Sequence, residues 1–179
     1  MKKFIFAFIA TVMLTGVSFG QSVQNPTEDE VKDGLATILQ NIIEQQTVVY
    51  KSGMSYAQFK AALYKDNKAS TTLPKEGDDL FKKTYSYIVK GGATKAQLKN
   101  DGFKEMAAAI IYADNYEKAH PGSDGGIAVC GGLSPDSFNP AFSSISGRGP
   151  CAWWQIGCWF NEIFGDLGPI IITILIGLL

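Results

Sequence analysis

The spacing of apolar residues between positions 27 and 119 predicts a series of amphipathic helices. In the first, apolar residues recur every three or four positions, which places them on one face of a helix. Thr27 and Glu30 mark its start as a capping box, in which each side chain accepts the backbone N–H of the other. The apolar face consists of Val31, Leu35, Ile38, Leu39, Ile42 and Ile43.

Similar signals predict three further helical segments. Capping boxes begin the first and the last of these three, and the pair Gly91-Gly92 ends the middle one. Because the connections are short, the helices are expected to pack as antiparallel neighbours. The pattern therefore predicts a mainly α fold, with a small four-to-five-helix bundle over residues 21–119. The further segments cover about 55–65, 78–90 and 94–118, the last interrupted near Gly102.

Two joints between these helices are similar in sequence. Residues 49–60 align without gaps onto 88–99, and both stretches contain a helix end, a glycine, a capping box and an apolar restart. A duplicated helical hairpin would give this pattern. Two joints that independently use the same capping chemistry also give it. The dissimilar flanking residues favour this second explanation.

The composition changes twice after the last predicted helix. Residues 120–150 are rich in glycine, proline and serine, which predicts a flexible linker, a domain boundary and a preferred site of proteolysis. Residues 151–179 form an apolar segment that contains all three tryptophans of the chain. Its last ten residues are aliphatic except for Thr173 and Gly177.

The N-terminus carries the pattern of a secretory signal. Two lysines follow the first methionine, an uncharged run extends from Phe4 to Val17, and the small residues Ser18 and Gly20 precede Gln21. This order predicts a cleavable signal peptide over residues 1–20, with an uncleaved N-terminal anchor as the alternative. The predicted location is secreted, periplasmic or at the cell envelope.

The apolar C-terminal segment indicates contact with a membrane. Tryptophan favours the boundary between water and lipid. A helix over residues 170–179 would be about 15 Å long, half of a hydrocarbon core of about 30 Å. Residues 153–179 are long enough to span, but Glu162, Asp166 and Pro169 interrupt them, and a charge near the bilayer centre costs about 3 kcal/mol.

These lengths and charges favour shallow association, partial insertion or an oligomer over a single span. Burial of the same segment in a soluble core is the alternative, and the absence of a polar side favours the membrane. The candidate membrane contacts are Trp153, Trp154, Trp159, Phe160, Ile170, Ile171, Ile172, Ile174, Leu175 and Ile176.

The cysteines of an exported protein are candidates for disulfides. On a continuous helix, the α-carbons of Cys151 and Cys158 would lie roughly 10 Å apart, beyond the reach of a disulfide. A helix break at Gly157 would permit the bond. Pairing of Cys130 with either of them is equally open, and the third thiol would then be odd and available between chains.

Charge and motifs exclude several classes of function. Residues 121–179 contain one basic residue, Arg148, against four acids, and residues 21–120 are balanced. Without a basic stripe, nucleic-acid binding is excluded. The chain has no serine-hydrolase, zinc-protease, P-loop or dinucleotide motif, so neither an enzyme nor a cofactor is predicted. Its single histidine and three cysteines match no zinc spacing, so no metal site is predicted either.

Two functional hypotheses follow. The first is an exported non-enzymatic helical protein whose residues 151–179 associate with membrane; in its sharper form, cleavage within 121–150 releases a membrane-active peptide. In composition this segment resembles the secreted peptide bacteriocins, being Gly- and Trp-rich with a cysteine pair and an apolar end, but its negative charge departs from their cationic character. The second is a soluble secreted or periplasmic binding or scaffold module whose tail packs on the helices or mediates homo-oligomerisation. The expected partner is a lipid membrane or an envelope protein.

Overall fold

The computed structural model describes residues 25–65, 73–123, 125–141 and 151–179. The predicted signal peptide lies outside this part of the chain. The mainly α fold is confirmed, since the described residues form helices, turns and a single isolated bridge between Tyr64 and Phe138. The α-helices are α1 (Glu28–Gln46), α2 (Tyr56–Ala62), α3 (Lys75–Val89), α4 (Lys95–Asp101), α5 (Phe103–Ala119), α6 (Gly125–Ala128), α7 (Ile156–Phe164) and α8 (Gly168–Leu178). Short 3₁₀ turns cover Thr47–Val49, Pro135–Ser137 and Gly165–Leu167.

Capping boxes begin three of these helices, as the sequence predicts. At α1 the Thr27 backbone N–H donates to Glu30 Oε2 at 2.7 Å, and the Glu30 N–H donates to Thr27 Oγ1 at 3.3 Å. The same reciprocal bonds begin α2 and α4. They satisfy backbone donors that a helix start otherwise leaves without partners.

Helix α3 begins three residues earlier than the acidic pair at 78–79 indicates. Its first residue is Lys75, and Pro74 occupies the N-cap with φ −62°. Proline is tolerated there because the first N–H groups of a helix have no intrahelical partner and its φ is already suitable. The acids therefore lie within the first turn and just after it.

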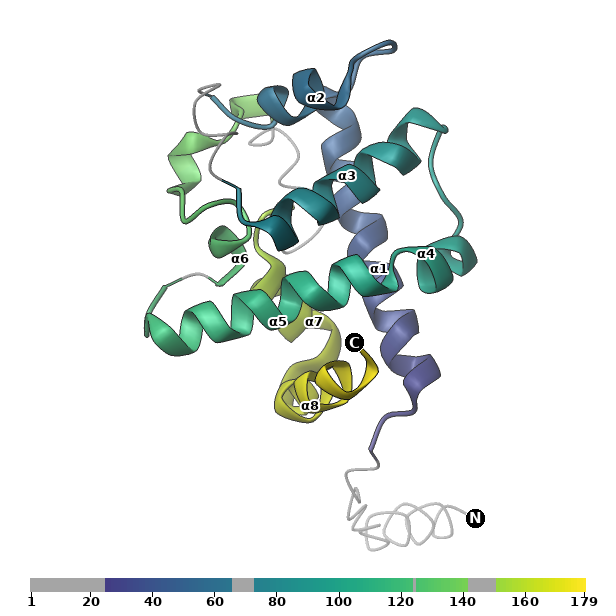
Figure 1. The fold of residues 1–179 in the computed structure, drawn as a ribbon, viewed down its shortest axis with the longest axis vertical. Helices are drawn as coiled ribbons and strands as arrows, with labels where there is room; N and C mark the ends of the chain where they lie inside the picture. The colour runs from purple at the N-terminus through teal and green to yellow at the C-terminus, as the bar shows by residue number, and fades with distance from the viewer. Residues whose placement is uncertain (1–24, 66–72, 124, 142–150) are drawn as a thin grey trace, which may run out of the picture.

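Helix α1 runs along the long axis of the molecule and is crossed by α3 and α5 (Figure 1). It packs against α3, α4, α5 and α7, while α8 packs against α5 and α7. In Figure 1, α2 lies at one end of the described fold and α8 towards the other. A single apolar cluster extends from Val31 in α1 to Leu175 in α8, so the C-terminal segment shares the core of the preceding helices.

Part of the predicted linker also joins this core. Its described residues include the short helix α6, and a Cβ added at Gly126 would lie 2.4 Å from both the Trp154 carbonyl oxygen and the Ile156 backbone nitrogen. Glycine therefore allows two backbones to approach closely, where its abundance had indicated a flexible chain. Residues 142–150 of the predicted linker lie outside the described part. Buried residues of the segment are Gly125, Gly126, Ala128, Val129, Cys130 and Phe138.

Candidate functional site

A disulfide joins Cys151 to Cys158, one of the pairings that the sequence leaves open. Their α-carbons are 5.8 Å apart, because α7 begins only at Ile156 and most of the loop between the two cysteines is not helical. The expected helix break at Gly157 is wrong, because Gly157 lies inside α7. The bond is possible because the helix starts late. Cys130 is a buried thiol outside this disulfide.

Hydrogen bonds hold the disulfide loop against its neighbours. The Gln45 side-chain amide of α1 donates to the Cys151 carbonyl at 3.0 Å. The Trp159 indole N–H donates to the Ala152 carbonyl at 2.9 Å, and the Ala152 N–H donates to Gln155 Oε1 at 2.9 Å. Since unpaired polar groups are costly to bury, these bonds stabilise the loop in its buried position.

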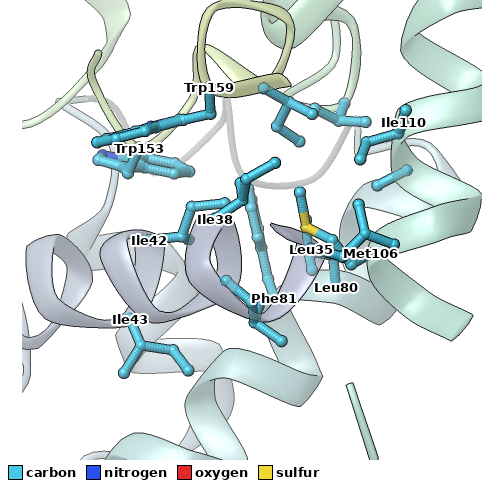
Figure 2. Close-up of a cluster of buried hydrophobic side chains, with 14 of the residues drawn as sticks. Leu35, Ile38, Ile42, Ile43, Leu80, Phe81, Met106, Ile110, Trp153 and Trp159 are labelled. Carbon is cyan, nitrogen blue, oxygen red and sulfur yellow. The ribbon is translucent and has the colours of Figure 1, made fainter. Parts of the chain in front are cut away.

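Two of the three tryptophans belong to the protein core. Trp153 is 1% exposed and packs edge-on against Phe81, with ring centroids 5.2 Å apart. Trp159 is also buried, and Figure 2 shows both indoles on the side of α1 that carries Ile38 and Ile42. Trp154 is half-buried and stacks on Phe138 at 4.4 Å.

Helix α8 has two different faces. The inner face, made of Ile171, Ile172 and Leu175, is buried against α5 and α7. The opposite side, called here the outer face of α8, is uncharged, and Ile176 on it is 60% exposed. Thr173 is the one polar side chain of the helix, and its hydroxyl donates to the Pro169 carbonyl at 3.0 Å. The outer face consists of Pro169, Ile170, Thr173, Ile174, Ile176 and Gly177.

The ten candidate membrane contacts therefore fall into three groups. In this conformation six are buried in protein, three are half-buried, and Ile176 alone is exposed. The buried six are covered because α7 and α8 fold back onto α1 and α5. In this conformation, contact with a membrane is therefore open only to the outer face of α8. The buried residues are Trp153, Trp159, Phe160, Ile171, Ile172 and Leu175, and the half-buried ones are Trp154, Ile170 and Ile174.

The two C-terminal helices together have the length and composition of a membrane span. Ile156–Leu178 is the one helical stretch, within the described residues, that is long and apolar enough to cross a bilayer. It is bent in the folded protein, because Gly165, the residue that follows α7, has φ 50° and ψ −131°. Glu162 and Asp166 lie exposed on either side of this bend.

A separate polar cluster joins α2 to α3. The Tyr56 hydroxyl donates to Asp78 Oδ1 at 2.8 Å, and Lys60 Nζ lies 2.9 Å from the same oxygen. Lys82 Nζ lies 2.7 Å from Asp78 Oδ2. Partial burial alone would raise the pKa of Asp78, but the hydrogen bonds from Lys82, Lys60 and Tyr56 outweigh it and lower the pKa to about 2. The cluster holds α2 against α3, because each of its charged or polar side chains is paired with another member of the cluster.

No group of three potential metal ligands occurs among the described residues. The chain matches no protein-family model, and comparisons with curated proteins and with solved structures find no match either.

Proposed function

We propose that this chain is an exported, non-enzymatic helical protein that associates with a lipid membrane through the outer face of α8. The inner face of the same helix keeps it anchored on α5 and α7. The observation that carries the proposal is the exposure of Ile176, at 60%, on a helix without a charged side chain. A surface helix of a soluble protein normally turns charged or polar residues to water.

The chemistry of the outer face suits lipid. After Asp166 the chain has no ionisable side chain. The Thr173 hydroxyl is bonded to the backbone of its own helix, so moving it out of water leaves no donor without a partner. Contact with the headgroup and acyl boundary would remove Ile170, Ile174 and Ile176 from water, and burial of apolar surface is favourable by about 25 cal/mol per Å².

The charges near α8 limit the depth of this contact. Helix α8 has 11 residues and is therefore about 16 Å long, too short to span a hydrocarbon core of about 30 Å. Full insertion of α7 and α8 would carry Glu162 and Asp166 into lipid, at about 3 kcal/mol each. It would also remove the inner face of α8 from the core. Shallow docking of the folded protein avoids both costs.

Export is supported by the disulfide and by the N-terminal sequence. Disulfides persist mainly in oxidising compartments outside the cytoplasm, and Cys151–Cys158 is such a bond. In the sharper form of the proposal, cleavage within residues 121–150 frees residues 151–179 as a membrane-active peptide. Both cysteines lie in that fragment, so it would keep its ring. The intact mass of exported protein tests this form, because an uncut chain of residues 21–179 as the only species contradicts it.

Docking is tested by co-sedimentation of residues 21–179 with phospholipid vesicles. Replacing Ile174 and Ile176 together by serine removes two aliphatic side chains of the outer face and is expected to weaken vesicle binding by roughly tenfold or more. The matched control is Val48→Ser with Val89→Ser, which removes two aliphatic side chains that are exposed elsewhere, at 44% and 49%. Equal sedimentation of all three proteins would refute docking through α8.

The second candidate is a soluble secreted or periplasmic binding or scaffold module, in which the outer face of α8 meets a second copy. The burial of Trp153 and Trp159 favours it, because the residues with the strongest preference for a membrane interface are then committed to the core. Light scattering coupled to gel filtration separates the two. A dimer that becomes monomeric in the Ile174→Ser and Ile176→Ser variant, together with no vesicle binding, favours this candidate.

A further inference from the structure

A groove of about 520 Å³ lies between α5, α7 and α8. Its apolar lining includes Ile110, Ile156 and Ile172, each from a different helix and each buried. The volume falls within the range of about 300–1,000 Å³ that small-molecule sites occupy. Gly157 also lines the groove, and a Cβ added there would meet no atom within 4 Å. The wall of α7 is thus open at this position.

The polarity of the groove changes along α5. The five residues of α5 that line it lie between Ile110 and Lys118, a distance of about 12 Å along the helix. Ile110 and Ala113 at one end are buried and apolar, whereas Asp114, Glu117 and Lys118 at the other end are ionisable. The groove therefore has an apolar end and a charged end.

The charged end is negative. Lys118 Nζ lies 2.6 Å from Asp114 Oδ2, so these two charges compensate each other. Glu117 has no ion pair with any described residue, which leaves one net negative charge. Helix α5 ends at Ala119, and the carbonyl end of a helix carries a partial negative charge that favours cations.

A second hollow of about 380 Å³ adjoins the charged end. Its lining shares Asp114, Glu117 and Lys118 with the groove and adds Pro121 and Gly122 from the turn after α5. An apolar compartment and a polar compartment thus meet at the same three side chains. A molecule with an apolar chain and a positively charged head matches both compartments at once.

We propose that this groove binds a single-chain amphiphile with a cationic head group. Its hydrocarbon chain lies on Ile110 and Ile172, and its head lies beside Glu117 in the second hollow. The lining favours an aliphatic chain, because Phe160 is its one aromatic side chain. An anionic head would meet the charge of Glu117 without compensation. The groove shares Pro169, Thr173 and Ile176 with the outer face of α8. It takes a free molecule from solution, however, so the inference goes beyond the proposed membrane docking.

The test is calorimetric titration of residues 21–179 with dodecyltrimethylammonium below its critical micelle concentration. Dodecyl maltoside and laurate, which have similar chains and neutral or anionic heads, are the comparisons. The expected result is one site per chain that binds the cationic probe several-fold more tightly than the neutral one and the anionic one most weakly. Equal binding of the cationic and anionic probes, or no binding of the cationic probe, would overturn the proposal.

Two variants locate the site. Gly157→Leu places a side chain into the groove and is expected to weaken binding by about tenfold or more, since it displaces roughly two methylene groups of the ligand. Gly157→Ala is the matched control with little added volume, and both changes favour the helix over glycine. Glu117→Gln is expected to weaken binding of the cationic probe by about two- to fivefold, as for an exposed ion pair, and to leave dodecyl maltoside binding unchanged.

The outcomes separate this site from docking. Circular dichroism first establishes that each variant keeps the helical fold. If Gly157→Leu then binds the cationic probe as tightly as the unaltered protein, the groove is not the site. A protein that sediments with vesicles but does not bind the probe overturns this inference alone. A protein that binds the probe at the groove without sedimenting overturns membrane docking alone.

Discussion

Gly126 provides the sharpest test of how the C-terminal segment is held. A methyl group at this position would lie 2.4 Å from the Ile156 nitrogen, 2.4 Å from the Trp154 carbonyl oxygen and 2.7 Å from the Gln155 α-carbon. All three are backbone atoms, so no rotation of a side chain relieves the contact. In Gly126→Ala, α6 and the chain before α7 are therefore forced apart.

The expected cost follows from comparable overpacking. Inserting a methyl group into a well-packed site destabilises a protein by typically about 1–3 kcal/mol. Alanine recovers at most about 1 kcal/mol through its better helix propensity, and α6 has only four residues in which to do so. The net loss is about 1–3 kcal/mol, which corresponds to a fall in Tm of roughly 2–10 °C for a chain of this size.

The assay is urea unfolding of residues 21–179 followed by far-ultraviolet circular dichroism and tryptophan fluorescence. Gly157→Ala is the matched control, because the added methyl group meets no atom within 4 Å. It is expected to leave the free energy of unfolding unchanged or to raise it by up to about 1 kcal/mol. If Gly126→Ala is as stable as Gly157→Ala, the close packing of α6 on the C-terminal segment is refuted.

Two further predictions concern pH and redox state. The folded-state pKa of Asp78 is about 2, below the ordinary 3.8 of an aspartate, so the ionised side chain stabilises the fold above pH 4. This contribution of about 2 kcal/mol is lost as the pH falls towards 2. Asp78→Asn should abolish that part of the pH dependence of urea unfolding, and an unaltered profile would contradict the prediction. Replacing Cys151 and Cys158 by serine should lower the free energy of unfolding by about 2–3 kcal/mol, as the entropy of so short a loop implies. Reduction of the unaltered protein should cost the same amount, and a stability insensitive to reductant would show that the bond contributes nothing.

Local signals along the chain predicted much of the helical part. The capping boxes at Thr27, Ser55 and Thr94 each depend on residues three positions apart, so no knowledge of the fold is needed to find them. The apolar face of α1 is also a local pattern, and it is buried as predicted. The acidic pair at 78–79 indicates too late a start for α3, because Pro74 occupies the N-cap and the helix begins at Lys75, ahead of the acids.

The burial of the C-terminal region could not be predicted in the same way. Glycine is frequent both in flexible chains and where two backbones pack closely. Only the neighbouring segment shows which of these applies, and for Gly126 that neighbour is the backbone at Trp154. Likewise, the sequence identifies Trp153 and Trp159 as residues that need apolar surroundings but not whether lipid or Phe81 supplies them. The groove beside Gly157 left no local signal at all, because its walls come from three separate helices.

The corner at Gly165 has a consequence for how α7 and α8 behave together. Its φ of 50° and ψ of −131° are accessible to glycine, whereas a residue with a Cβ would be strained there. Helical angles at Gly165 would still not fuse the two helices into one rod. Pro169 would then lie inside a helix, without the N–H that bonds the Gly165 carbonyl and with its ring against that carbonyl. The corner therefore has two independent causes, Gly165 and Pro169, and it leaves the exposed carboxylates of Glu162 and Asp166 in water while α8 lies on α5 and α7.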